Sequence, residues 1–223
     1  MPRKNNPQET IERIINASLK LFKEKGFDKT SMQDIVDASD MSKGAIFYHF
    51  KSKEEIFEAT MDREYTHVKE RFHAFVEKLE GDTAKEKMKK MITVTFADEE
   101  ISTDSYDIFK AIINSPHLAM ASMYKNTTEI SPIVAGLIKE GIADGSIITN
   151  FPDELGEVFI LLYNQWCNIY PFKCDLSTLR NRLKFLQHMM ANLGCDIVTD
   201  EVIDFNMKLC EKYESVLKEV QND

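Results

Sequence analysis

A short segment near the N-terminus combines side chains that hold a helix on a protein with side chains that can meet a negatively charged partner. Residues 42–53 read SKGAIFYHFKSK, with three lysines, and with three aromatic residues between positions 47 and 50. On a helix, Ile46 and Phe50 are four residues apart and point to the same side, so both can enter an apolar core. Lys43 is then free to approach a phosphate or a guanine edge. The segment is predicted to have one face for a protein core and one for a polyanion.

Two short helices joined by a tight turn are predicted to position this segment. The first spans Thr30–Ser39 and is opened by a capping box at residues 30–33, and the second spans Ser42–Phe50. This pair has the pattern of a helix-turn-helix unit. An earlier helix that ends at Gly26 would complete a three-helix core. The predicted core residues are Ile14, Leu21, Phe22, Ile35, Val36, Ile46 and Phe50.

The exposed face of the second helix is predicted to contact DNA. In helix-turn-helix proteins the N-terminal turn of that helix meets base edges in the major groove, and here the turn is Ser42–Ala45, whose glycine lets the backbone come close. Tyr48 and His49 have polar tips suited to phosphate oxygens. Thr30 and Lys53 lie at two other helix N-termini, where N–H groups and the helix dipole favour phosphate. The predicted DNA-binding residues are Thr30, Ser42, Lys43, Gly44, Ala45, Phe47, Tyr48, His49 and Lys53. The alternative interpretation is a surface helix with stray charges over an aromatic core cluster.

Residues 10–56 resemble the DNA-binding domain of the TetR family of bacterial transcriptional regulators. The matching stretch is IINASLKLFKEKGFDKTSMQDIVDASDMSKGAIFYHFKSKEEI. The matching positions are Gly26, Phe27, Thr30, Ser42, Lys43, Gly44, Tyr48, His49, Phe50, Ser52 and Lys53. The turn departs from the family pattern, because Asp40 stands where the family usually has glycine. Aspartate tolerates a left-handed backbone better than most residues, but its carboxylate near the DNA face is expected to weaken binding.

The resemblance implies that the remainder of the chain is a divergent helical body that binds a small ligand and dimerises. The family architecture places the dimer interface on the last pair of long helices, which here would be Pro152–Tyr170 and Asp175–Leu193. A further helix, from Thr199 to about Val220, would be an addition to that bundle. Within the body, Ser131-Pro132 is predicted to cap and open a helix that Gly145 ends.

The predicted fold is all-α, with about ten helices in two domains. Residues 1–53 are predicted to form the three-helix DNA-binding domain, and residues 54–223 the larger ligand-binding and dimerisation domain. A long helix over residues 52–79 would link the two domains. The four cysteines, at positions 167, 174, 195 and 210, form no C-x-x-C motif and are expected to be free and buried.

Charge is distributed unevenly along the chain, although the net charge is −9. Residues 1–53 hold 10 Lys+Arg and 7 Asp+Glu, and the rest of the chain holds 18 and 30. A basic head on an acidic body is compatible with DNA binding, because phosphate contacts are local. No apolar run approaches the ~18 residues of a membrane span, so the protein is expected in the cytoplasm with no membrane partner.

The body is rich in methionine and aromatic residues, which can line an adaptable apolar pocket. The candidate ligand-binding residues are Phe72, Phe109, His117, Met120, Tyr124, Tyr163 and Trp166. Ordinary core packing is the alternative interpretation at each of these positions. The chain contains no G-x-G-x-x-G, G-x-x-x-x-G-K-[ST], H-E-x-x-H or G-x-S-x-G motif. We therefore expect neither an enzyme nor a cofactor or metal site.

The leading hypothesis is a homodimeric transcriptional repressor that leaves a pseudo-palindromic, double-stranded DNA operator when a small-molecule effector binds. The alternative is a helical small-molecule-binding or interaction module that no longer reads DNA, supported by Asp40 and the net acidity. Salt-dependent binding to the protein's own upstream region would separate the two, because phosphate neutralisation gives a steep salt slope.

Overall fold

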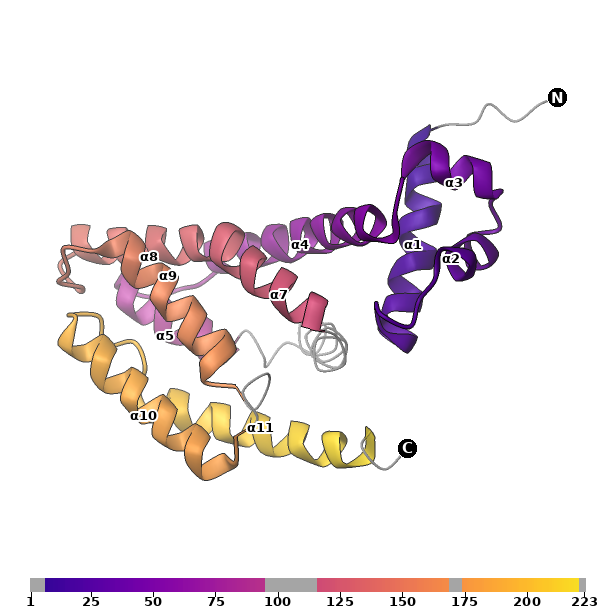
Figure 1. Ribbon diagram of the computed structural model, residues 1–223. Helices are drawn as coiled ribbons and strands as arrows, with labels where there is room; N and C mark the ends of the chain where they lie inside the picture. The colour runs from indigo at the N-terminus through magenta and orange to yellow at the C-terminus, as the bar shows by residue number, and fades with distance from the viewer. Residues whose placement is uncertain (1–6, 95–115, 169–173, 221–223) are drawn as a thin grey trace. The chain divides into compact units, whose positions relative to one another are not determined.

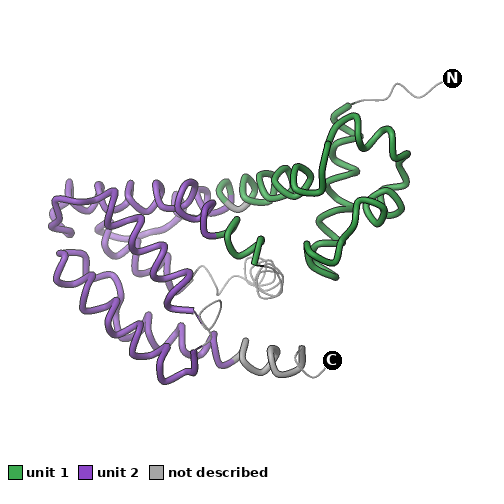
Figure 2. Tube along the Cα trace, in the orientation of Figure 1, with its two compact units in different colours: residues 1–70, 104–122 green, residues 71–103, 123–223 purple. Residues whose placement is uncertain are grey.

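A computed structural model describes residues 7–94, 116–168 and 174–220. All regular structure among these residues is helical, which confirms the predicted all-α class (Figure 1). The chain divides into two compact units, one of residues 1–70 and 104–122 and the other of residues 71–103 and 123–223 (Figure 2). The domain boundary predicted after residue 53 stays a prediction. Among the described residues, no helix is both long and apolar enough to cross a membrane.

The first unit contains the predicted helix-turn-helix. Its helices are α1 (Pro7–Lys25), α2 (Met32–Ser39), α3 (Lys43–His49), most of α4 (Lys53–Glu77) and the beginning of α7 (Pro116–Lys125). Ile14, Ile35 and Ile46, one from each of the first three helices, are completely buried together. The rings of Phe22 and Phe57 meet edge to face with centroids 5.5 Å apart, which ties α1 to α4. The predicted three-helix core is therefore confirmed, with Leu21 and Val36 partly buried at its margin.

The start of α2 differs from the sequence prediction. Ser31, not Thr30, is the N-cap, and its hydroxyl accepts a hydrogen bond from the Asp34 N–H at 3.2 Å. The Asp34 carboxylate accepts the Ser31 N–H at 2.7 Å, which completes a capping box one residue later than predicted. Lys25 adds an ion pair at 2.7 Å. Lys25 also donates a hydrogen bond to the Asp34 carboxylate, and this bond is the largest cause that holds the pKa of Asp34 far below its usual value. The hydrogen bonds from Ser31 are the next largest cause.

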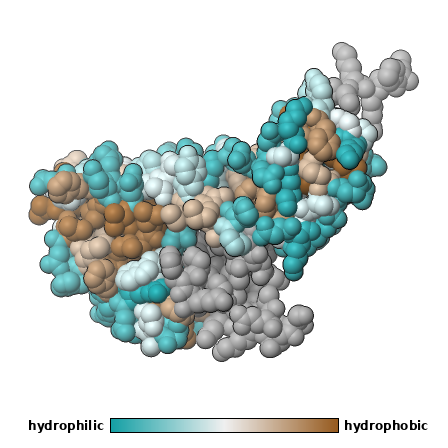
Figure 3. Space-filling view, viewed as in Figure 1, coloured by the Kyte–Doolittle hydropathy of each residue, from teal (hydrophilic) through white to brown (hydrophobic). Residues whose placement is uncertain are grey.

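The second unit is a bundle of helices in which two glycines permit close contacts. Its elements are the end of α4, α5 (Ala84–Val94), the end of α7, the π-helical turn η1 (Asn126–Ile130), α8 (Ser131–Ala143), α9 (Pro152–Leu161), the π-helical turn η2 (Leu162–Trp166), α10 (Leu176–Asn192) and α11 (Asp200–Val220). A Cβ at Gly156 would lie 3.0 Å from the Ala135 backbone nitrogen, so this glycine lets α9 pack tightly on α8. Gly194 ends α10 at a φ of 80° and accepts the Ile148 N–H. Figure 3 shows apolar residues gathered at the surface over α8 and α9.

Helix α8 begins at Ser131 as predicted, but Ser131 is not its N-cap. The chain stays helical from α7 through η1 into α8, and the Ser131 hydroxyl bonds back to the Thr127 carbonyl. Proline inside a helix removes one backbone hydrogen bond and crowds the preceding turn. The π-helical turn just before Pro132 widens the backbone, and the Ser131 N–H reaches the Asn126 carbonyl five residues back. The proline is thus accommodated within one continuous helical path.

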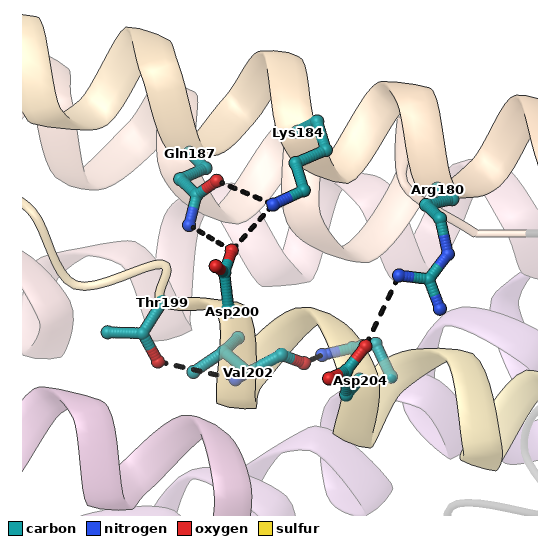
Figure 4. Close-up of polar contacts among 8 residues, drawn as sticks. Arg180, Lys184, Gln187, Thr199, Asp200, Val202 and Asp204 are labelled. Carbon is teal, nitrogen blue, oxygen red and sulfur yellow. Dashed lines mark hydrogen bonds and ion pairs between the residues drawn. The ribbon is translucent and has the colours of Figure 1, made fainter.

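The helix after residue 199, predicted as an addition to the bundle, packs against α10. Asp200 accepts hydrogen bonds from Lys184 at 2.6 Å and Gln187 at 3.0 Å, and Arg180 pairs with Asp204 at 3.2 Å (Figure 4). These polar contacts are exposed, and Leu179, Leu183 and Leu186 of α10 are completely buried. Burial of apolar side chains of this size stabilises a fold more than exposed ion pairs do.

Candidate nucleic-acid interface

Helix α3 begins with a capped and solvent-exposed turn. The Ser42 hydroxyl accepts the Ala45 N–H at 3.2 Å, which satisfies one of the free donors at the helix start. Ser42, Lys43 and Gly44 are all exposed. A Cβ built on Gly44 would meet no atom within 4 Å, so the fold itself does not require glycine there. The surface in front of this turn is therefore open to a partner that approaches the backbone.

The opposite side of α3 anchors the helix in the core. Ile46 is completely buried and Phe50 is 8% exposed, as their spacing predicted. The Phe50 N–H donates to the Ile46 carbonyl at 2.8 Å and closes the last turn. Lys51 caps this end, because its ammonium group donates to the Phe47 carbonyl at 2.8 Å. Sequence reasoning had not assigned Lys51, although a lysine just beyond a helix C-terminus is a signal for this role.

The outward-facing residues of α3 are aromatic and basic. Tyr48 is 78% exposed, and its ring packs edge to face on His49 with centroids 5.0 Å apart. The Lys43 ammonium group lies 5.8 Å from the centroid of Phe47, which is half-buried. The Lys43 charge and the Tyr48 hydroxyl are thus presented on a helix whose orientation the buried residues fix. Such groups are suited to hydrogen bonds with phosphate oxygens and base edges.

The turn between α2 and α3 carries the one unusual backbone conformation among the described non-glycine residues. Asp40 has φ 52° and ψ 40°, the left-handed region that glycine normally occupies. Arg13 of α1 supports this turn, because its guanidinium donates to the Ser39 carbonyl at 3.1 Å. The same guanidinium lies 3.8 Å from the Asp40 carboxylate, which is fully exposed. The departure from the glycine pattern is therefore accommodated, and it leaves a negative charge at the surface of the turn.

Two of the predicted phosphate contacts are engaged within the protein. Thr30 is 2% exposed, its hydroxyl donates to the Gly26 carbonyl at 2.7 Å, and its N–H donates to the Phe27 carbonyl. Thr30 therefore fixes the α1–α2 turn. Its hydroxyl and its N–H both donate within the protein, so neither is free to donate to the expected phosphate. The Lys53 ammonium group donates to the Phe27 carbonyl at 2.8 Å and lies 4.1 Å from the Phe27 ring centroid. The phosphate contact of Lys53 stays a prediction, and phosphate would share an ammonium group that already holds this turn.

The described candidate ligand residues are distributed over α4, α7 and η2. Phe109 lies outside the described residues, and Phe72 is half-buried on α4. In the first unit, His117 packs on Phe27 with ring centroids 4.7 Å apart, and its Nδ1 lies 3.4 Å from Asp28. This histidine therefore supports the α1–α2 turn.

Two other candidates, Met120 and Tyr124, are 64% and 65% exposed on α7. Tyr163 and Trp166 both lie on η2. Tyr163 donates a hydrogen bond to Asn206 at 3.0 Å, and burial raises the pKa of the Tyr163 phenol. Trp166 meets Phe185 edge to face at 5.7 Å between centroids. A ligand-binding role for these residues stays a prediction.

Comparisons with known proteins agree with the helix-turn-helix geometry. Residues 14–60 match the family described as "Bacterial regulatory proteins, tetR family". The uncharacterized HTH-type transcriptional regulator YerO of Bacillus subtilis (strain 168) is 38% identical over 171 residues, which are 76% of this chain and 58% of YerO. The biofilm operon icaADBC HTH-type negative transcriptional regulator IcaR of Staphylococcus aureus (strain Newman) is 38% identical over 50 residues, 22% of this chain and 27% of IcaR. The chain thus covers less than two thirds of the length of these relatives.

A solved structure supports the same fold over nearly the whole chain. The crystal structure of a putative TetR-family transcriptional regulator from Mesorhizobium loti has a TM-score of 0.55 and 19% sequence identity. The match covers 96% of this chain and 98% of that chain. At this identity the likeness concerns the fold alone, whereas the family match lies over residues 14–60, which include the helix-turn-helix. The chain belongs to the tetR family of bacterial regulatory proteins.

Proposed function

We propose that this protein is a transcriptional regulator that binds operator DNA through α3. The observation that carries the proposal is the division of α3 into two faces: Ile46 and Phe50 are buried, whereas Lys43 and Tyr48 are presented to solvent. The match of residues 14–60 to the tetR family supports it. In this role the N-terminal turn of α3 enters the major groove. The role requires no catalytic step and no cofactor, and it places the protein in the cytoplasm with the DNA.

The proposed operator-binding form is a two-fold homodimer. Large apolar side chains are exposed on and beside α9 and α10: Ile148, Phe151, Val158, Phe185 and Leu193 are between 39% and 81% exposed. A surface of this kind favours self-association, and a two-fold axis presents the same patch on both subunits. The operator would then be pseudo-palindromic, with half-sites about 34–36 Å apart or a multiple of one DNA turn. Light scattering at micromolar protein should give twice the mass of the 25.7 kDa chain, and a monomer would refute this part.

We further infer that the protein is a repressor released by a small-molecule effector bound in the second unit. The name of the relative IcaR describes it as a negative transcriptional regulator. Tyr163 and Trp166, which both lie on η2, are the proposed effector contacts. Because ligand binding shifts an equilibrium only by its differential affinity, the effector must bind more tightly to the DNA-free form than to the operator complex.

The test is a titration of DNA from the protein's own upstream region, at several salt concentrations, with wild-type protein and three variants. Lys43→Ala and Tyr48→Phe should each lose about 1–3 kcal/mol of binding free energy without loss of helicity. Lys208→Ala removes the same charge from an exposed position of α11 in the second unit and serves as the control. Wild-type affinity should fall steeply with salt.

Unchanged affinity in both α3 variants would overturn the assignment of α3. Absence of salt-dependent binding would instead favour a helical interaction module, for which the exposed carboxylate of Asp40 is the specific observation.

A further inference from the structure

The first two turns of α7 belong to the same compact unit as the helix-turn-helix, although α7 begins more than 60 residues after α3 (Figure 2). Leu118 is 6% exposed and lies in the core of this unit. Ser122, one turn later, is 5% exposed and accepts a hydrogen bond at 2.6 Å from the hydroxyl of Tyr65 on α4. The start of α7 is therefore firmly attached to the unit that carries α3.

His117, beside Leu118, contacts the α1–α2 turn at two points. Its ring lies on Phe27, with the ring centroids 4.7 Å apart. Its Nδ1 lies 3.4 Å from the carboxylate of Asp28. The His117 side chain is 58% exposed, whereas Phe27 is 4% exposed. His117 therefore covers Phe27 from the outside and is not itself a core residue.

The same phenylalanine holds Lys53, the first residue of α4. The Lys53 ammonium group lies 4.1 Å from the centroid of the Phe27 ring, and the face of an aromatic ring attracts a cation. The ammonium group also donates to the Phe27 carbonyl at 2.8 Å. This carbonyl takes one of the three donors of a lysine, which leaves donors for a phosphate oxygen. Phe27 thus fixes the direction of the Lys53 side chain without using up its hydrogen bonds.

We propose that His117 is a positioning residue for DNA binding, which holds the Phe27 ring in place so that Lys53 is oriented for a backbone phosphate. The proposal rests on the proposed function, in which the first unit binds operator DNA. A lysine side chain that is free in solution loses rotamer freedom when it binds a phosphate, and a side chain that is already held loses less. The contribution of His117 therefore passes through Phe27 and requires the ammonium group of Lys53.

Two other roles for His117 make different predictions. If His117 only stabilised the fold, its truncation would weaken DNA binding equally with and without the Lys53 ammonium group. If His117 itself bound a phosphate, the contact would need a ring nitrogen, and a phenyl ring in its place would bind DNA no better than alanine does. A positioning role instead needs an aromatic ring at this position and a lysine at position 53.

The experiment measures the affinity of the full-length protein for DNA from its own upstream region, with variants at both positions. His117→Ala should weaken binding about two- to tenfold, the cost of fixing one long side chain. His117→Phe keeps a ring on Phe27 and should bind as wild type does. Lys53→Met keeps the stem and removes the ammonium group. In the Lys53→Met protein, His117→Ala should cause no further loss, because residues that act through one contact are not additive.

Met123→Ala is the control, since it truncates a side chain that is 39% exposed farther along α7, and it should bind as wild type does. Circular dichroism should show that each variant keeps its helices, as expected for an exposed histidine. Equal losses from His117→Ala in the wild-type and Lys53→Met proteins would overturn the proposal. Full affinity in His117→Ala, or an equal loss in His117→Phe, would also overturn it. If wild type itself does not bind the DNA, the proposed function fails and this inference fails with it, whereas the other outcomes concern His117 alone.

Discussion

The two compact units distribute polar and apolar groups in opposite ways. On α3 in the first unit, charged and polar groups face solvent above a core of isoleucine and phenylalanine. In the second unit, Phe151 and Phe185 are 62% and 56% exposed, while the Tyr163–Asn206 pair lies inside. The first arrangement suits a partner made of phosphates and base edges, and the second suits an apolar partner surface. The difference is in keeping with the proposal that operator DNA binds to the first unit and a second subunit to the second.

The largest expected effect comes from the apolar anchor beneath α3. Ile46→Ala removes a completely buried side chain from the core shared by α1, α2 and α3 and leaves a cavity there. Such a truncation should lower the free energy of unfolding by about 2–5 kcal/mol. Urea unfolding followed by circular dichroism measures the loss. Tyr48→Ala on the exposed face of the same helix is the control, and it should change stability little while weakening operator binding.

Equal destabilisation by Ile46→Ala and Tyr48→Ala would contradict the division of α3 into an anchoring face and a binding face. A DNA-binding defect with full stability in Ile46→Ala would do the same.

The next largest loss of stability is expected at the buried polar pair of the second unit. Tyr163→Phe removes the hydroxyl that exchanges hydrogen bonds with Asn206, a residue that is 8% exposed. Leaving a buried amide partly unpaired should cost about 1–3 kcal/mol. Tyr163→Phe combined with Asn206→Leu removes both partners and should recover part of this loss, because no amide then remains unpaired. A double variant that loses the full sum of the single losses would show that the two side chains do not stabilise each other.

The first unit could be predicted from sequence in detail because its pattern is local. Ile46 and Phe50 are one helical turn apart, and both proved to be buried. What could not be predicted there depends on contacts between distant residues. Thr30 and Ser31 are both good caps, and the Lys25–Asp34 ion pair, visible only in three dimensions, accompanies capping by Ser31. Lys53 likewise has its carbonyl partner 26 residues away.

The second unit was predicted less well because its helices do not keep one period. Ser131-Pro132 has the residue types of a helix start, yet a π-helical turn carries the helix through it. Residue propensities do not predict such a turn, because its hydrogen bonds join residues five apart and tertiary packing stabilises them. A second π-helical turn, η2, rotates Tyr163 and Trp166 relative to the face that a regular helix predicts. The candidate ligand residues were chosen by residue type alone, and such a choice contains no information on a turn of this kind.

A smaller effect concerns the capping box that opens α2. The pKa of Asp34 is depressed in the folded protein, first by Lys25 and then by Ser31. Its contribution to stability is therefore present above the unfolded-state pKa of about 3.9 and is lost as pH falls further toward the folded-state pKa. Asp34→Asn should lower the melting temperature at pH 7 by less than Ile46→Ala does. The gap between wild type and Asp34→Asn should narrow as the pH is lowered from 5 to 3, and a constant gap would show that the charge is not the cause.

The smallest effect sharpens the comparison at the turn that precedes α3. Asp40 adopts a left-handed conformation with φ 52°, and its carboxylate is fully exposed beside Arg13. Asp40→Gly removes both the negative charge and the backbone cost of a side chain in that region. Asp40→Asn removes the charge and keeps a side chain that tolerates the left-handed backbone.

Both variants should bind operator DNA more tightly at low salt, by less than about fivefold, since an exposed charge interacts weakly through water. The gain should fade as salt is raised, because screening reduces the repulsion between the carboxylate and the phosphates. Only Asp40→Gly is expected to raise the melting temperature as well. If neither variant binds DNA more tightly, the Asp40 carboxylate does not face the phosphates, and the orientation of α3 on the operator must place this turn away from the backbone.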